Sequence, residues 1–182
     1  MTEISSRITT TESIWSIIDT IGVIEFGFVA QALLGIIFFR LGGKIISIKN
    51  TGHPDILLYY ETKKWRIEVE VIGRDRNEHV IKSDDLSATK AMQSNETGFL
   101  AILDINIPAR WYMLRTEEIY NVGEKRYKLF ELRMRSDKNL SKECSQELYK
   151  IIAEHKDTIL KEGYSGLVKI IRQQNNEILF ED

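Results

Sequence analysis

The segment of residues 26–39, FGFVAQALLGIIFF, carries no charged residue, and this apolar run limits most narrowly how the chain can fold. Glu25 and Arg40 flank it, and it is shorter than the roughly 20 apolar residues that a bilayer-spanning helix needs. A helix that is apolar on nearly every side must be covered by other elements of the fold. We therefore expect a buried central helix in a soluble, cytoplasmic protein that makes no membrane contact.

The composition is that of one globular domain, or of one domain with a modest extension. The chain has 182 residues, of which 43% are hydrophobic and 29% are charged. A net charge of −2 gives no bulk attraction to a polyanion, so a nucleic-acid surface would have to be a local basic patch. The single cysteine, Cys144, excludes an internal disulfide and a Cys-based zinc cluster, and three scattered histidines argue against a His-rich metal site.

The hydrophobic pattern predicts an α/β fold with helices at both ends of the chain. Apolar residues at helical spacing favour a first helix over residues 13–41, which a glycine pair at 42–43 would end. The further elements that we expect are strands at 44–49, 55–60 and 65–72, a helix at 83–93, strands at 98–105 and 111–115, a strand- or hairpin-like segment at 124–138, and an amphipathic helix at 141–163.

The change of character near residue 117 suggests a boundary, but no linker-like segment marks it. We therefore expect a core at residues 1–116 and a C-terminal extension of hairpin and helices at residues 117–182, packed together as one domain.

Acidic and apolar residues alternate along the third expected strand, WRIEVEVI. A turn of two or four residues centred between Thr62 and Lys63 would place Asp55 opposite Glu70, and Leu57 would then face Glu68. Side chains opposite each other in an antiparallel pair have Cβ atoms about 5 Å apart, so three carboxylates would project from one face at one end of the hairpin. A slip of one residue would bury these carboxylates and expose the apolar row, which explains the register.

Three carboxylates this close repel one another, and a cation that neutralises them makes such a cluster tolerable. Oxygen ligands of this kind suit Mg²⁺, Mn²⁺ or Ca²⁺. A different interpretation is that Glu68 and Glu70 form only the solvated face of an amphipathic edge strand.

The order of the expected elements, together with the segments GHPDI (residues 52–56) and RIEVEV (residues 66–71), resembles the PD-(D/E)xK nuclease superfamily. The resemblance covers roughly residues 14–115. It implies a restriction-endonuclease-like core, α-β-β-β-α-β-β, with a mixed central sheet flanked by helices and followed here by a C-terminal helical extension.

The resemblance also implies roles for particular residues. Asp55 and Glu68 would be ligands of Mg²⁺, for which Mn²⁺ would substitute, and the Val69 carbonyl would be a third ligand. Glu25, on the first helix, matches a glutamate that many members carry there.

The sequence departs from the family at position 70, where the usual lysine is Glu70. Some restriction enzymes of this fold are similar in having E-x-E, with the second glutamate orienting or deprotonating water. In others the lysine comes from a neighbouring element, and Lys90 and Lys82 are candidates for that role here. As helix charges they would otherwise be ordinary solvated lysines.

Basic residues near the two motifs could contact phosphates. Those near the core motifs are His53, Arg74, Arg76 and Lys82, and a later group consists of Lys125, Arg126 and Lys128, with Tyr127 and Phe130 interleaved.

The function expected from this pattern is metal-dependent endonucleolytic hydrolysis of DNA, without an organic cofactor. Cutting a duplex needs two sites, so we expect a homodimer. An alternative is a catalytically decayed protein of the same fold that binds DNA or a partner protein. A third is a binding module whose hairpin carboxylates are ordinary surface charge.

Overall fold

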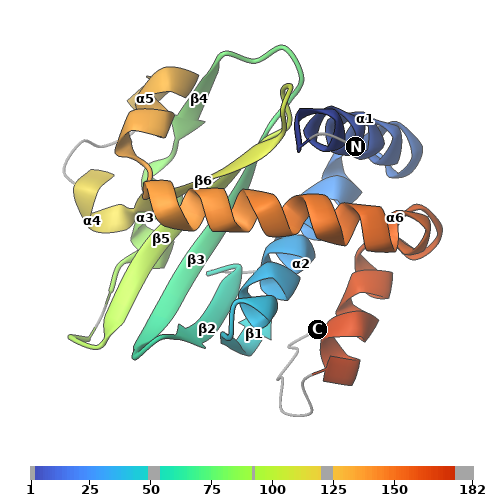
Figure 1. The fold of residues 1–182 in the computed structure, drawn as a ribbon. Helices are drawn as coiled ribbons and strands as arrows, with labels where there is room; N and C mark the ends of the chain where they lie inside the picture. The colour runs from blue at the N-terminus through green and yellow to red at the C-terminus, as the bar shows by residue number, and fades with distance from the viewer. Residues whose placement is uncertain (1–2, 49–53, 92, 120–124, 175–182) are drawn as a thin grey trace.

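A mixed five-stranded sheet with helices on both faces forms the centre of the computed structural model (Figure 1). The structure describes residues 3–48, 54–91, 93–119 and 125–174. The strands of the central sheet, in spatial order, are β1 (Lys44–Ile48), β2 (Ile56–Tyr60), β3 (Lys63–Ile72), β5 (Glu96–Asp104) and β6 (Arg110–Arg115).

The directions of the strands make the sheet mixed. β1, β2 and β3 are antiparallel neighbours, β3 and β5 are parallel, and β6 is antiparallel to β5. The parallel pair needs a long connection, which contains β4 (Glu78–Ile81) and α3 (Ser83–Thr89). The expected α/β class and the strands around the acidic hairpin are confirmed, whereas β4 was not predicted.

The β2–β3 hairpin turns one residue earlier than its sequence indicated. Ile56 pairs with Ile67, and Tyr60 pairs with Lys63, which leaves a two-residue turn in which Glu61 has a φ of 54°. The predicted register is therefore wrong by two residues. In such a turn, glycine or asparagine usually occupies the position with positive φ, and glutamate rarely adopts this conformation. The sequence therefore contains no local signal for a turn at this point. A shift of two preserves the alternation of faces, and the acidic residues remain on one side.

The expected single N-terminal helix is in fact two helices, α1 (Glu3–Ile21) and α2 (Val23–Arg40). Gly22, with a φ of 88°, separates them. By length and composition α2 could cross a membrane, but most of its side chains are buried within this structure. It packs against β1, β3 and the long last helix.

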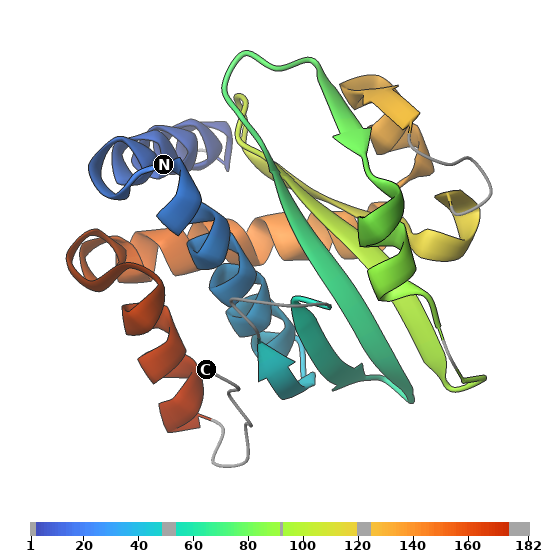
Figure 2. The same cartoon turned by 180° about the vertical axis from the view of Figure 1, so that it is seen from behind.

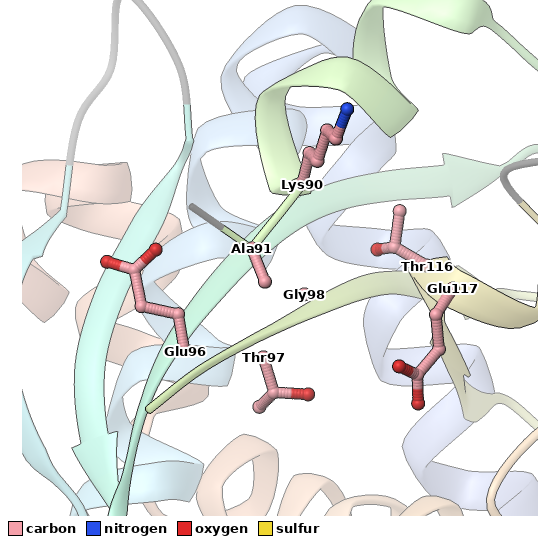
Figure 3. A pocket seen from close by; sticks show the side chains of 7 residues that line it. All are labelled: Lys90, Ala91, Glu96, Thr97, Gly98, Thr116 and Glu117. Carbon is pink, nitrogen blue, oxygen red and sulfur yellow. The ribbon is translucent and has the colours of Figure 1, made fainter. Parts of the chain in front are cut away.

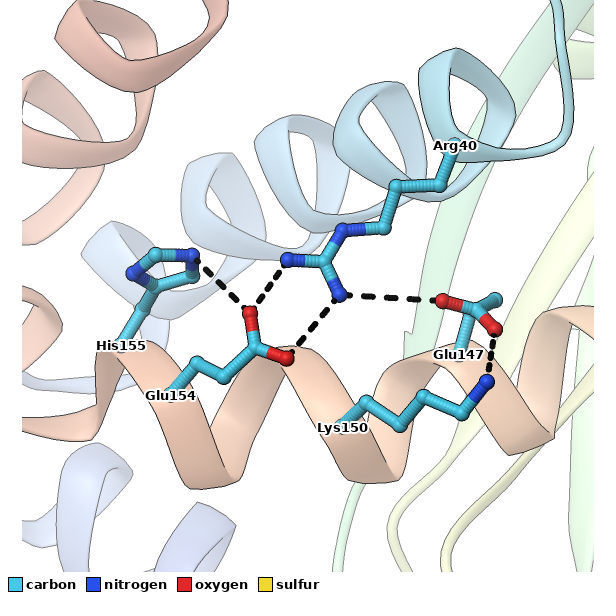
Figure 4. Close-up of polar contacts among 5 residues, drawn as sticks. All are labelled: Arg40, Glu147, Lys150, Glu154 and His155. Carbon is cyan, nitrogen blue, oxygen red and sulfur yellow. Dashed lines mark hydrogen bonds and ion pairs between the residues drawn. The ribbon is translucent and has the colours of Figure 1, made fainter.

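That last helix, α6 (Lys138–Gln174), bends at Gly163 and packs against α1, α2 and β6. An ion-pair network joins it to the end of α2, where the Arg40 guanidinium contacts the carboxylates of Glu147 and Glu154 (Figure 4). The apolar side of α6 and the thiol of Cys144 are buried in the main core. α1, α2 and α6 thus cover one face of the sheet.

The other face of the sheet, which is turned towards the viewer in Figure 2, carries a second, smaller apolar core. It is covered by α3, α4 (Thr116–Ile119), α5 (Leu129–Arg135) and a two-stranded ladder of β4 and β7 (Lys125–Lys128). The prediction of a hairpin at 124–138 is wrong, because only β7 is extended and a helix follows it. The helix expected at 83–93 ends at Thr89, and its N-cap is Lys82.

Candidate active site

Four acidic side chains gather where β2, β3 and α3 meet on this second face of the sheet. Asp55 lies immediately before β2, Glu68 and Glu70 lie on β3, and Asp85 lies in the first turn of α3. The negative charge of Asp85 acts on both glutamates, and that of Asp55 acts on Glu70. The expected grouping of three carboxylates at one end of the hairpin is thus present, and a fourth joins them.

Backbone groups hold the first two members of this acidic cluster. The Val69 N–H donates a hydrogen bond of 2.8 Å to Oδ2 of Asp55, and the Asp55 N–H in turn donates to the Glu68 carboxylate. These reciprocal bonds follow from the observed register, in which Asp55 lies one residue beyond the pair Ile56–Ile67. The bonds fix both carboxylates against the same short piece of backbone.

Three of the four members of the cluster are buried, and Glu70 is half-buried. Glu68 is 4% exposed, Asp85 6% and Asp55 8%. Burial, reinforced by the charges of Asp85 and Glu70, raises the pKa of Glu68 to about 8. Burial and the nearby Asp85 also raise the pKa of Glu70. Buried carboxylates that crowd together disfavour their charged forms, so without a counterion the cluster retains protons near neutral pH.

Asp85 is the member of the cluster that was not predicted from the sequence. An acidic residue in the first turn of a helix is favourable whatever the function, so it does not by itself indicate a site. The neighbouring Asp84 is exposed, whereas Asp85 is buried, and Oδ2 of Asp85 has no hydrogen-bond partner within the described parts of the chain. Glu70 forms a side-chain hydrogen bond with Asp85, which links the helix to the strand.

Contacts at the C-terminal end of α3, after Asp85, hold the helix against the sheet. The Arg66 guanidinium donates to the Ala88 carbonyl at 3.2 Å, and the hydroxyls of Thr89 and Thr116 lie 2.8 Å apart. At Gly98 on β5, an added Cβ would lie 2.0 Å from the Thr89 carbonyl oxygen. Only glycine allows α3 to approach the sheet this closely, and this approach brings Asp85 to the two glutamates.

The possible metal ligands at this site are carboxylate oxygens that are largely buried and that repel one another. A bound divalent cation would relieve this repulsion. Nonetheless, within residues 3–48, 54–91, 93–119 and 125–174, no three Asp, Glu, His or Cys side chains are arranged as a ready-made metal-binding group. The residues thus suit Mg²⁺ or Mn²⁺ chemically, and side chains would have to reorient to coordinate one.

Glu25, expected as a further metal ligand, has a different partner. Its Oε1 accepts a hydrogen bond of 2.8 Å from the backbone N–H of Tyr164, just after the bend at Gly163. The contact joins the first turn of α2 to α6. Glu25 therefore makes a structural contact at the α6 bend. Its charge and that of Asp55 both act on Tyr164, so it lies near the acidic cluster, and its role as a metal ligand stays a prediction.

The structure separates the two candidate lysines. The charge of Lys82, at the N-cap of α3, acts on Glu70 and lowers its pKa. Lys90 lies at the other end of α3, where it lines a cavity of about 310 Å³ beside Glu96 and Glu117 (Figure 3). In the β3–β5 register Glu96 lies four residues before Leu100, the partner of Glu68, a separation of about 13 Å along the strand. Lys82 is therefore the lysine at the cluster.

The expected phosphate-contacting residues lie in different settings. His53 is outside the described residues. Arg74 forms an ion pair of 3.0 Å with Asp19 and lies over the Trp15 ring, and Arg76 is exposed. Lys125, Arg126 and Lys128 are exposed on β7, whereas Tyr127 between them is buried.

Neither a scan against protein-family models nor a search of the curated proteins finds a match for this chain. The function therefore has to be argued from the site.

Proposed function

We propose that this protein is a metal-dependent nuclease of the restriction-endonuclease-like fold, which hydrolyses phosphodiester bonds in DNA at the cluster of Asp55, Glu68, Glu70 and Asp85. The observation that carries the proposal is the burial of Asp55, Glu68 and Asp85 beside the half-buried Glu70, with the pKa of Glu68 raised to about 8. Such a cluster costs folding free energy unless a cation is bound, so its presence favours a binding role.

The arrangement of elements supports the same fold. Helices precede a three-stranded antiparallel unit, the acidic residues lie on its second hairpin, and a helix then leads into two further strands of the same sheet. This is the order that the PD-(D/E)xK resemblance implies, with β4 added before α3.

The residues present suggest a division of tasks. Asp55 and Glu68 would hold Mg²⁺ or Mn²⁺, with the Val69 carbonyl and Asp85 as further oxygen donors. A bound divalent ion would polarise the scissile phosphate and lower the pKa of the attacking water. The Val69 N–H orients the Asp55 carboxylate. Glu70, whose pKa is raised by burial and by Asp85, would accept a proton from water. Lys82 supplies positive charge beside Glu70.

A second candidate is a protein of the same fold that binds DNA or a partner protein without cleaving it. The hydrogen bond between Glu70 and Asp85, and the lack of a ready-made ligand group among the described residues, favour this alternative. In both cases we propose a homodimer acting in the cytoplasm; cleavage of both strands of a duplex would need two sites.

Incubation with plasmid DNA and with labelled oligonucleotides, in Mg²⁺, Mn²⁺ or EDTA, tests the proposal. We expect cleavage with either metal, and its loss in the Asp55→Asn, Glu68→Gln and Asp85→Asn variants. Asp84→Asn, which removes the adjacent but exposed carboxylate, is the matched control and should cleave normally. Salt-sensitive DNA binding without cleavage in either metal would establish the second candidate instead.

A further inference from the structure

Two large apolar side chains are exposed side by side on α5. Phe130 is 64% exposed and Met134 is 71% exposed. They are four residues apart, so they lie one turn apart on the same side of the helix. Leu132, between them in sequence, is fully buried in the second core and anchors the helix from its other side. The exposed pair is therefore a fixed surface feature and does not result from a loosely packed helix.

A collar of positive charge surrounds this pair. The exposed cations of β7 and α5 are Lys125, Arg126, Lys128, Arg133 and Arg135. Arg126 is paired with Glu78. The only acidic residue in this segment, Glu131, accepts a hydrogen bond from the Lys128 N–H. The remaining cations leave the surface positive around an apolar tip.

The buried ring of Tyr127 organises part of this collar. The ammonium of Lys125 lies 5.2 Å from the ring centroid, and the guanidinium of Arg135 lies 5.5 Å from it. Contacts of this kind hold a cation in place while its charge faces outward. Tyr127 was expected as a surface aromatic among basic residues, but its role here is to position two cations.

The surface formed by β7 and α5 begins beside the acidic cluster. Lys125 pairs with Ile81 in the β4–β7 ladder, and Ile81 precedes Lys82, whose charge acts on Glu70. From there β7 leads directly into α5, which lies next to β4 in Figure 1. A chain of phosphates could therefore pass from the cluster along β7 to the tip of α5.

We propose that Phe130 and Met134 bind the bases of single-stranded nucleic acid, while Lys128, Arg133 and Arg135 contact its phosphates. This inference rests on the proposed function. It specifies that the nucleic acid bound beside the acidic cluster is single-stranded. An exposed aromatic ring within a basic surface suits single strands, because any unpaired base can stack on it. A neutral partner surface would use the apolar pair but leave the collar unmatched.

Binding of a labelled single-stranded oligonucleotide to the full chain, measured by fluorescence anisotropy in EDTA, tests this inference without any cleavage. We expect Phe130→Leu to weaken binding about 5-fold or more, because leucine stays apolar but offers no ring for a base to stack on. Phe130→Tyr should restore affinity. Ile24→Ala, which shortens an 82% exposed side chain at the start of α2, is the matched control and should bind as the unaltered protein does.

The salt dependence separates the two parts of the surface. Phe130→Leu should leave the slope of log K against log salt unchanged, whereas Arg133→Gln should reduce it by about 0.7 for a single strand. Equal affinity of Phe130→Leu and the unaltered protein would overturn the inference, and so would duplex binding that depends on Phe130 as strongly as single-strand binding does. If Phe130→Leu changed the oligomeric state but not the nucleic-acid affinity, the exposed pair on α5 would instead be a contact between copies of the chain. This result would also overturn the inference.

The same assay separates this inference from the proposed function. Asp55→Asn and Glu68→Gln should bind the oligonucleotide normally in EDTA even though we expect them not to cleave. Loss of cleavage without loss of binding would contradict nothing in the assignment of Phe130 and Met134 to base binding. Binding that does not depend on Phe130 would overturn that assignment but would not affect the nuclease proposal.

Discussion

The carboxylate of Asp55 accepts a hydrogen bond of 2.8 Å from the backbone N–H of Val69, the residue between the two glutamates of the E-x-E motif. The bond fixes the aspartate that precedes β2 against the middle of β3. It therefore places carboxylates from two separate chain segments within reach of one another. A register different by one residue would turn Glu68 and Glu70 to the other face of the sheet.

Replacement of Asp55 should separate this structural role from a metal-binding one. Asp55→Asn retains a side-chain oxygen for the Val69 N–H, so its melting temperature without metal should stay near that of the unaltered protein. Asp55→Ala should lose about 1–3 kcal/mol, because the N–H then lacks its acceptor. Both variants should lose the stabilisation by Mn²⁺ that we expect for the unaltered protein, about 2.7 kcal/mol when Mn²⁺ is at 100 times its Kd. Differential scanning fluorimetry measures both effects, and equal Mn²⁺ stabilisation of all three proteins would remove Asp55 from the site.

The raised pKa of Glu68 predicts how stability without metal depends on pH. The folded protein holds this proton up to about pH 8, whereas the unfolded chain releases it near pH 4.5. Between these values the folded state binds more protons, so this group makes stability fall as the pH rises. Glu68→Gln should resemble the unaltered protein at pH 4.5 and be more stable than it at pH 8.5, with about 2–4 °C in melting temperature for each kcal/mol.

Denaturant unfolding of both proteins across this pH range, in EDTA, gives the comparison. The difference between the two proteins isolates Glu68 from the other titrating groups. A difference that does not change with pH would mean that Glu68 ionises normally in the folded protein.

Metal binding should release protons from the cluster. At pH 7 the raised pKa keeps Glu68 largely protonated, and an oxygen ligand binds a cation in its ionised form. The affinity for Mn²⁺ should therefore increase between pH 6 and pH 8, by up to about tenfold per pH unit for one released proton. Isothermal titration calorimetry in two buffers of different ionisation enthalpy counts these protons directly. The same heat in both buffers would show that binding is not coupled to Glu68.

The closeness of α3 to the sheet predicts a strong effect at Gly98. Gly98→Ala would place a Cβ 2.0 Å from the Thr89 carbonyl oxygen and 2.9 Å from the Thr116 hydroxyl. Overpacking of this kind costs about 1–3 kcal/mol, and here it would also push Asp85 away from the glutamates. Gly27→Ala on α2 is the matched control, because no atom lies within 4 Å of its added Cβ and alanine favours a helix. Thermal unfolding should show a clear loss for Gly98→Ala and an unchanged or higher melting temperature for Gly27→Ala.

Two substitutions of Glu25 distinguish its structural contact from a metal-binding role. Glu25→Gln keeps an oxygen that can accept from the Tyr164 N–H, so both stability and Mn²⁺ binding should be retained. Glu25→Ala should lower the melting temperature, because it removes the contact between α2 and the bend of α6. If Glu25→Gln abolished Mn²⁺ binding at normal stability, Glu25 would have to be a ligand after all.

Several features followed from the sequence because they depend on neighbours along the chain. The alternation in WRIEVEVI specified which face of β3 is acidic, since side chains alternate across a strand whatever its partner is. The uncharged run in residues 26–39 required a buried helix, because no solvated surface stabilises so many apolar side chains. The grouping of Asp55 with Glu68 and Glu70 followed from one hairpin, whose two strands are adjacent in sequence.

The tertiary structure decided what depends on distant segments. Asp85 joined the cluster because Gly98 lets α3 pack closely on the sheet, and nothing in the sequence around Asp85 specifies that distance. Glu25 found its partner at a bend in α6 that is remote in sequence, and Tyr127 became buried because the β4–β7 ladder covers the second face of the sheet. Local periodicity fixes the direction in which a side chain points. The groups that this side chain contacts depend on how distant parts of the chain pack together.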